Sequence, residues 1–113
     1  IENTVKIAEK CNVEFEFGHT ILPNYDVPEE FETHYDYLKK LCDDGLIERY
    51  GENPSKEILD RAEYELGVIK KMGYVDYYLI VWDFIHYAKS VGIPVGPGRG
   101  SGAGSILAYS LQI

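Results

Sequence analysis

The stretch VGPGRGSGAGS, residues 95–105, places five glycines in eleven positions and constrains the fold more than any other part of the sequence. Glycine loses more conformational freedom on folding than other residues, so each one costs about 0.5–1 kcal/mol relative to alanine inside a helix or strand. A regular element is therefore a poor structure for these residues. We expect the glycines to form a turn that lets the backbone come close to another group.

The residues on either side predict that this turn joins a strand to a helix. Residues 75–90, VDYYLIVWDFIHYAKS, are apolar almost all round and contain no turn signal, which favours a buried helix over a strand. Gly92 should end this helix, and residues 93–95 should follow as a short buried strand. Helical spacing resumes over residues 101–113, with an apolar face of Ala103, Ile106, Leu107, Ala108 and Leu111.

A strand-to-helix turn of this composition is suited to bind an anion. The start of a helix leaves backbone amides unpaired, and glycines let a ligand approach them. Ser101 adds a hydroxyl donor, and Arg99 adds a permanent planar cation that pairs well with phosphate. The residues thus predict a phosphate site.

Other interpretations of the turn remain open. A P-loop requires a lysine followed by Ser or Thr, which this stretch does not have. Gly98, Gly100 and Ala103 match the dinucleotide pattern G-x-G-x-x-A, but the acidic residue expected about 20 positions later would fall beyond Ile113. A glycine-rich turn that serves packing alone is the third possibility.

A first long helix is predicted over residues 26–50. Asp26 is a suitable N-cap, and Pro28 supplies the backbone angle of a first helical turn. Gly45 should interrupt or end the helix. The inward face would carry Phe31, Tyr35, Leu38, Leu41 and Cys42.

A second long helix is predicted to follow the signal Asn53-Pro54, again a cap residue and a proline. Its apolar positions recur at helical spacing, and Gly73 should close it. These positions are Ile58, Ala62, Leu66, Ile69 and Met72, whereas the charged residues, Arg61 among them, should form a solvated face.

The first 27 residues predict less regular structure. Residues 3–10 have the pattern of a short helix, and residues 13–17 alternate apolar and acidic side chains as in an edge strand. Residues 18–27 contain turn formers and should be a connector. Since the chain has no initiator methionine and its last residues predict an unfinished helix, we expect it to be a piece of a longer protein.

Composition limits the class of protein. The chain of 113 residues is 45% hydrophobic, with no signal peptide or membrane-spanning segment in its pattern, so we expect a soluble, cytoplasmic globular protein. Its formal net charge of −8 has the wrong sign for binding nucleic acid over a broad surface. Cys11 and Cys42 have neither disulfide-framework nor zinc spacing.

The segment 72–113 reads MGYVDYYLIVWDFIHYAKSVGIPVGPGRGSGAGSILAYSLQI. It resembles, without a gap, the start of the palm domain in the alpha subunits of bacterial DNA polymerase III, the replicative C-family polymerases. A weaker likeness extends through ILDRAEYELGVI and IAEKCNVEF to the N-terminus. The form GPGRGSGAGS is similar to the DnaE-type enzymes.

The resemblance implies a fold and a site. The fold would be a mainly α fragment of an α+β palm of the polymerase β type, with three to five helices and a short strand leading into the glycine-rich turn. The family's Gly-Ser pair, which contacts the phosphates of the incoming dNTP, falls on Gly100 and Ser101, beside Arg99. The supporting turn would consist of Gly96, Gly98, Gly102 and Gly104.

The resemblance also implies what this chain lacks. Residues 1–21 would be the tail of a PHP domain, and residues 22–113 the incomplete N-terminal part of the palm. The family's Mg²⁺-binding carboxylates lie in a P-D-x-D-x-D-F-like segment, and no P-D-x-D occurs here. We therefore expect no catalytic residue and no metal ligand in this piece, which should be inactive by itself.

The full-length protein would be a DNA-directed DNA polymerase that uses Mg²⁺ and adds dNMP from dNTP to a primer 3′ end. Its partners would be dNTP, primer-template DNA and, through other regions, the sliding clamp and proofreading subunit of the replisome. A freestanding nucleotide- or dinucleotide-binding module, and a helical packing unit without a ligand, are the alternatives.

Overall fold

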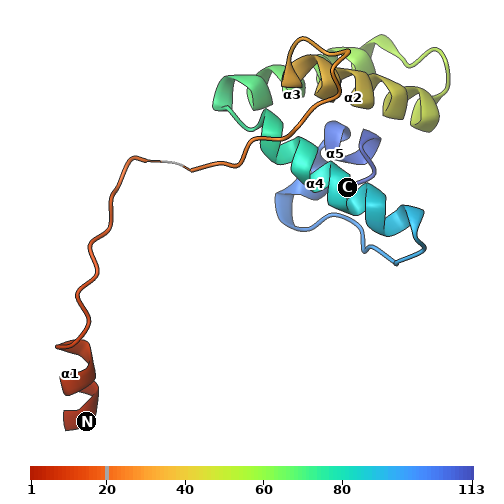
Figure 1. Ribbon diagram of the computed structural model, residues 1–113. Coiled ribbons are helices and arrows are strands. Elements are labelled where there is room, and N and C mark those ends of the chain that lie inside the picture. The colour runs from red at the N-terminus through yellow and green to blue at the C-terminus, as the bar shows by residue number, and fades with distance from the viewer. Residues whose placement is uncertain (20) are drawn as a thin grey trace.

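The structure is a computed structural model that describes residues 1–19 and 21–113 (Figure 1). The described residues form five α-helices and one 3-10 helix, and none of them lies in a strand. The helices are α1 (Glu2–Ala8), α2 (His34–Tyr50), α3 (Lys56–Met72), α4 (Val75–Ser90), the 3-10 helix η1 (Gly100–Gly104) and α5 (Ile106–Ser110).

The prediction of an α+β architecture with a short strand is therefore wrong. Residues 13–17 and 93–95, both predicted as strands, are irregular. A strand is stabilised by hydrogen bonds to a neighbouring strand, and neither segment has such a neighbour within the described ranges. Phe15, Phe17 and Ile93 remain 76%, 90% and 54% exposed, so alternation alone did not create a buried face.

Helices α2 to α5 enclose one apolar core, with the short α5 at its centre. Helix α5 packs against both α2 and α3, and α4 packs against α2. In Figure 1, α5 lies beneath α2 and α3. The buried cluster consists of Leu38, Cys42, Leu46, Ala62, Leu66, Ile69, Leu79, Leu107 and Leu111. Burial of a Leu or Ile side chain contributes about 1.5–3 kcal/mol, so this cluster is the main source of stability.

Helix α2 begins later than predicted, because Thr33 and not Asp26 is its N-cap. The Thr33 hydroxyl oxygen accepts a hydrogen bond from the Asp36 amide at 3.1 Å, and the hydroxyl donates to the Asp36 carboxylate at 2.6 Å. Before it, the Phe31 amide donates to the Pro28 carbonyl in a single turn. The connector instead packs its apolar side chains, including Tyr25 and Val27, against the core.

Gly45 does not end α2 but lies inside it. A Cβ atom at this position would lie 2.0 Å from the backbone oxygen of Ser110 in α5. This distance is far below van der Waals contact. Glycine is therefore required here for the close approach of two helices, a reason that no local pattern in the sequence reveals.

The ends of α3 and α4 agree with the predictions more closely. Gly73 ends α3 at φ 75°, and α4 spans the whole predicted segment. Gly92 has φ 77°, and the Ile93 amide donates to the Ala88 carbonyl at 2.9 Å. This is a Schellman motif, in which a left-handed glycine satisfies the last carbonyls of the helix. At its start α3 is capped by Ser55 instead of Asn53.

Helix α1 contributes no buried residue to the protein. Figure 1 shows it apart from the other helices, at the far end of an extended segment. Within the described part of the chain, no helix combines the length and the apolar character needed to cross a membrane.

Candidate functional site

The glycine-rich segment forms a different junction from the one predicted. Residues 93–99 are irregular, residues 100–104 form η1, and α5 begins only at Ile106. The expectation that a helix starts at Ser101 is therefore wrong. Glycine is unfavourable in a helix, so α-helix begins only where the glycines end and buried side chains follow. The first buried residues of α5 are Leu107 and Ala108.

The glycines of this segment are not explained by crowding in the described structure. For Gly96, Gly102 and Gly104, no described atom outside the adjacent residues and the backbone of the same helix lies within 4 Å of the place where a Cβ would stand. Gly98 has only ordinary neighbours, the nearest being the Ile113 oxygen at 3.7 Å. Gly100 has φ 58°, a left-handed conformation that favours glycine. Most of the segment thus presents bare backbone to open space.

Arg99 and Ser101 are both exposed but line different hollows on either side of the turn. Arg99 borders a hollow of about 520 Å³ between the glycine segment and α4, which we call the α4 hollow. Ser101 borders a hollow of about 330 Å³ over α3, the α3 hollow. The structure therefore brings the two predicted side chains to one turn but not into one cavity.

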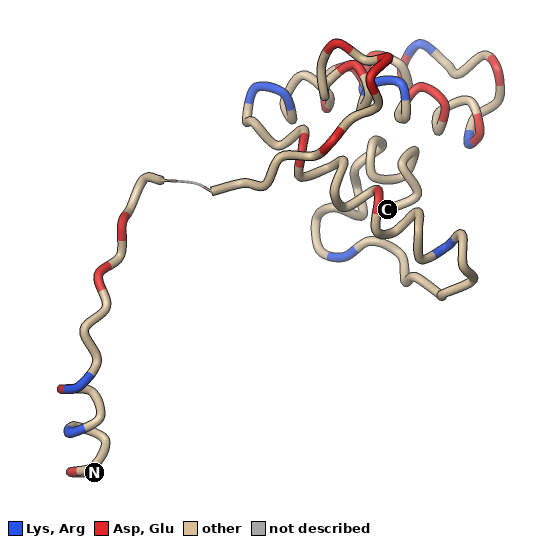
Figure 2. Tube along the Cα trace, viewed as in Figure 1, with Lys and Arg blue, Asp and Glu red and all other residues tan. Residues whose placement is uncertain are grey.

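The turn is locally positive in an acidic protein. Arg99 is the single charged residue between Ser90 and Ile113. Figure 2 shows acidic residues on α2, α3 and α4 and on the segments before α2, whereas the glycine segment is uncharged except at one basic position. An anion at the turn would thus meet a cation and bare backbone within the glycine segment itself.

Glu65, which was not among the predicted site residues, holds the junction between η1 and α5. Its Oε2 accepts hydrogen bonds from the Ser105 hydroxyl at 2.7 Å and from the Leu107 amide at 3.3 Å, and its Oε1 accepts from Arg61 Nε at 2.7 Å. The carboxylate side chain is 12% exposed. Burial raises the pKa of Glu65, but these hydrogen bonds outweigh it and leave the pKa lowered.

One sequence signal could have identified this residue. Glu65 stands between Ala62 and Leu66, at the edge of the apolar face of α3. An acidic side chain at such a position is costly unless it has a partner. Arg61, which was predicted to lie on a solvated face, is one of the partners of Glu65. Its own side chain is 58% exposed.

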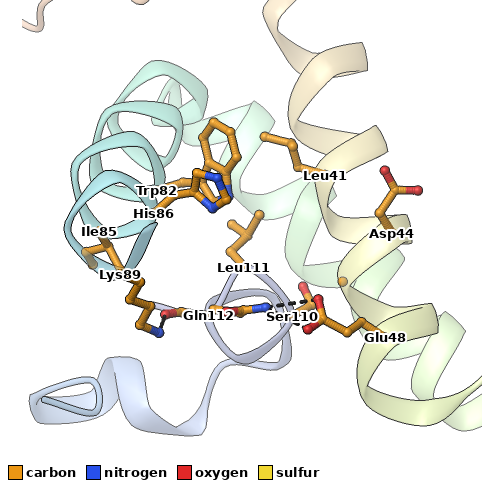
Figure 3. A pocket seen from close by; sticks show the side chains of 11 residues that line it. Leu41, Asp44, Glu48, Trp82, Ile85, His86, Lys89, Ser110, Leu111 and Gln112 are labelled. Atoms are coloured by element: carbon orange, nitrogen blue, oxygen red, sulfur yellow. Dashed lines mark hydrogen bonds between the residues drawn. The ribbon is translucent and has the colours of Figure 1, made fainter. Parts of the chain in front are cut away.

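A third hollow, of about 210 Å³, lies between α2, α4 and α5 (Figure 3). Trp82 and His86 stack on one side of it, with ring centroids 5.1 Å apart. Gln112 donates to both carboxylate oxygens of Glu48, and Lys89 donates to the Gln112 carbonyl. Gln112 has φ 62°, and its amide and the Ile113 amide donate to the Tyr109 and Ala108 carbonyls, so it is the left-handed residue at the end of α5. The bonds of Gln112 to Glu48 and of Lys89 to Gln112 thus connect the end of α5 to α2 and α4.

Residues 1–19 and 21–113 contain no group of three or more His, Cys, Asp and Glu side chains placed to hold a metal ion.

The sequence of the chain is similar to that of known proteins. A family model described as "Bacterial DNA polymerase III alpha NTPase domain" matches residues 36–113, more than half of the chain. The chain is similar to the DNA polymerase III subunit alpha of Halalkalibacterium halodurans, with 50% identity over 113 residues, which are 100% of this chain and 10% of that protein.

Two further relatives carry the same name. The DNA polymerase III subunit alpha of Borreliella burgdorferi is 55% identical over 114 residues, covering 100% of this chain and 10% of that protein. The corresponding subunit of Treponema pallidum is 53% identical over 111 residues, covering 98% and 9%. The chain therefore spans about a tenth of the length of these relatives.

Proposed function

The chain belongs to the bacterial DNA polymerase III alpha family, and on that premise we propose that it is part of a replicative DNA polymerase that transfers dNMP from dNTP to a primer 3′ end. Within that enzyme, the glycine segment binds the phosphates of the incoming dNTP through Arg99, Gly100 and Ser101. Gly96, Gly98, Gly102 and Gly104 supply the backbone that lets the triphosphate approach.

The open space at the glycines is the observation that carries this proposal. Among the described residues, Cβ atoms added at Gly96, Gly102 and Gly104 would meet no neighbour, in contrast to Gly45, so this backbone is open to a ligand. Gly100 and Ser101 begin η1, and the first amides of a helix have no partner within it. Backbone amides, one hydroxyl and one guanidinium are donors suited to a triphosphate.

The described residues do not offer a ligand set for Mg²⁺, so we assign no step of the reaction to a metal held by this chain. We propose that the metal-binding carboxylates come from other parts of the full-length subunit. The chain of 113 residues should accordingly fail to extend a primer in a Mg²⁺-dependent assay.

Further assignments follow from family membership. We propose that residues 1–21 belong to the end of the PHP domain and residues 22–113 to the start of the palm domain. The separation of α1 from the core helices supports this division. We propose a cytoplasmic enzyme whose partners are primer-template DNA and, through other regions, the sliding clamp and the proofreading subunit.

The test uses the full-length polymerase with Ser101→Ala, Arg99→Ala or Gly100→Val. Ser101→Ala removes one donor and should lower kcat/KM for dNTP roughly five- to 150-fold. This corresponds to a loss of transition-state stabilisation on the order of 1–3 kcal/mol. Gly100→Val should cost more, because a branched side chain both blocks the approach and strains a left-handed backbone. Arg99→Ala should raise the KM for dNTP and leave the Kd for primer-template DNA nearly unchanged.

Lys71→Ala is the matched control, because it removes an exposed cation from the C-terminal end of α3 and leaves the glycine segment unchanged. Its kinetic constants should equal those of the unmodified enzyme. Lowered melting temperatures with unchanged kcat/KM in the three turn variants would mean that the segment is architectural and that the phosphate proposal is wrong.

A further inference from the structure

We propose that Glu65 is a positioning residue for the phosphate-binding turn, an inference that rests on the function proposed above. Its carboxylate fixes Ser105 and Leu107, the residues at which η1 meets α5. The orientation of Gly100 and Ser101 toward a triphosphate then depends on a side chain from α3.

The link from Glu65 into η1 is continuous. The Ser105 hydroxyl donates to Glu65 Oε2 at 2.7 Å, and the Ser105 amide donates to the Gly102 carbonyl at 3.0 Å. Ser105 Oγ also accepts from the Ala108 amide at 3.1 Å and so caps α5. One serine thus connects the carboxylate, the 3-10 turn and the helix that follows.

The turn needs this link because it has little else to hold it. Helix η1 contains no buried residue, and four of its five residues are Gly or Ala. An α-helix of five residues, the length of α5, is not stable by itself in water. The segment is therefore positioned from its ends, and at the Ser105 end the nearly buried Glu65 is the charged group that holds it.

Arg61 makes a carboxylate acceptable beside an anion site. Arg61, Glu65, Ser101 and Ser105 all line the α3 hollow, so an unpaired Glu65 would repel a bound triphosphate. Arg61 donates to Oε1, which leaves Oε2 for Ser105 and Leu107. The guanidinium thereby offsets the charge of Glu65 without competing for the oxygen that holds the turn.

The experiment compares Glu65→Ala and Glu65→Gln in the full-length polymerase. Loss of the carboxylate should raise the KM for dNTP about tenfold, while the Kd for primer-template DNA changes less than about twofold. Glutamine keeps an acceptor oxygen for Ser105 and Leu107, so Glu65→Gln should stay within about threefold of the unmodified KM. Glu63→Ala, which removes an exposed glutamate of the same helix, should have no effect.

A purely structural role would lower the melting temperature of Glu65→Ala but leave the KM per active site unchanged, and that result overturns the inference. If Glu65→Ala does not fold, Ser105→Ala decides, because it cuts the same link and leaves the Arg61–Glu65 pair in place. Ser105→Ala should raise the KM for dNTP and Ser105→Thr should restore it; an unchanged KM in Ser105→Ala overturns the inference as well.

The variants of the turn separate the two proposals. If Arg99→Ala and Ser101→Ala raise the KM for dNTP and the Glu65 and Ser105 variants do not, the positioning role is wrong and the phosphate proposal stands. If none of the variants changes the KM, the phosphate proposal fails and the positioning role fails with it.

Discussion

At the scale of single residues, two glycines inside helices have opposite roles. Gly45 in α2 and Gly67 in α3 both lack a positive φ and both lie within 17-residue helices. A Cβ at Gly45 would collide with the Ser110 carbonyl at 2.0 Å, whereas a Cβ at Gly67 would meet nothing within 4 Å. The first glycine is therefore needed for packing, and the second only lowers helix propensity.

Gly45→Ala should lower the free energy of unfolding by about 3 kcal/mol, because the added methyl group forces α5 away from α2 and disturbs the core. Gly67→Ala is the matched control and should raise the free energy of unfolding by about 1 kcal/mol through helix propensity. Urea denaturation followed by circular dichroism measures both. Equal effects of the two substitutions would contradict the packing role of Gly45.

At the scale of elements, the start of α2 shows how a cap is selected. Asp26 and Thr33 are both suitable N-cap residues, but only Thr33 is followed by a helix. Tyr25 stacks on Tyr37, with ring centroids 6.4 Å apart, and Phe31 packs on the same ring at 4.9 Å. The connector that contains Asp26 thus packs on Tyr37 as an irregular segment, and α2 begins only after it.

Thr33→Ala should lower the free energy of unfolding by about 1 kcal/mol, because it leaves the Asp36 amide without its cap. Asp26 is exposed and caps no helix, so Asp26→Ala should change the free energy of unfolding by less than about 0.5 kcal/mol. Chemical denaturation of the two variants checks the assignment. A larger effect of Asp26→Ala would mean that the helix begins at the predicted position.

At the scale of the whole molecule, the structure divides into a core and an N-terminal segment. The core is built by α2 to α5, and every residue of its buried cluster lies between Leu38 and Leu111. Residues 1–19 are exposed throughout and include three large apolar side chains from residues 13–17. These residues contribute no burial to the core and therefore no hydrophobic stabilisation.

A shortened chain of residues 21–113 should accordingly keep the melting temperature of the whole chain to within about 2 °C, since no buried contact is removed. Its helical circular dichroism signal should decrease only by the contribution of the seven residues of α1. Chymotrypsin should cut the whole chain first after Phe15 or Phe17, where the backbone is exposed and irregular. A strongly lowered melting temperature would show that the N-terminal segment packs on the core.

Much of the helical structure could be predicted because its signals are local. The boundaries of α4, the left-handed glycines at 73 and 92 and the buried positions Ala62, Leu66 and Ile69 of α3 all follow from neighbours within a few residues. The candidate turn with Arg99, Gly100 and Ser101 was also identified from the sequence, since unusual glycine content is visible without a fold. Its phosphate role stays a prediction.

The remaining features depend on contacts between residues far apart in the chain. Residues 13–17 and 93–95 have strand-like sequences, but a strand exists only where a neighbouring strand pairs with it. Gly45 is required by Ser110, and Glu65 is held by Ser105, 40 positions later. Local sequence thus determined where most helices form, while tertiary packing decided where α2 starts, which glycine is indispensable and how the turn is anchored, because these depend on distances that only the folded chain defines.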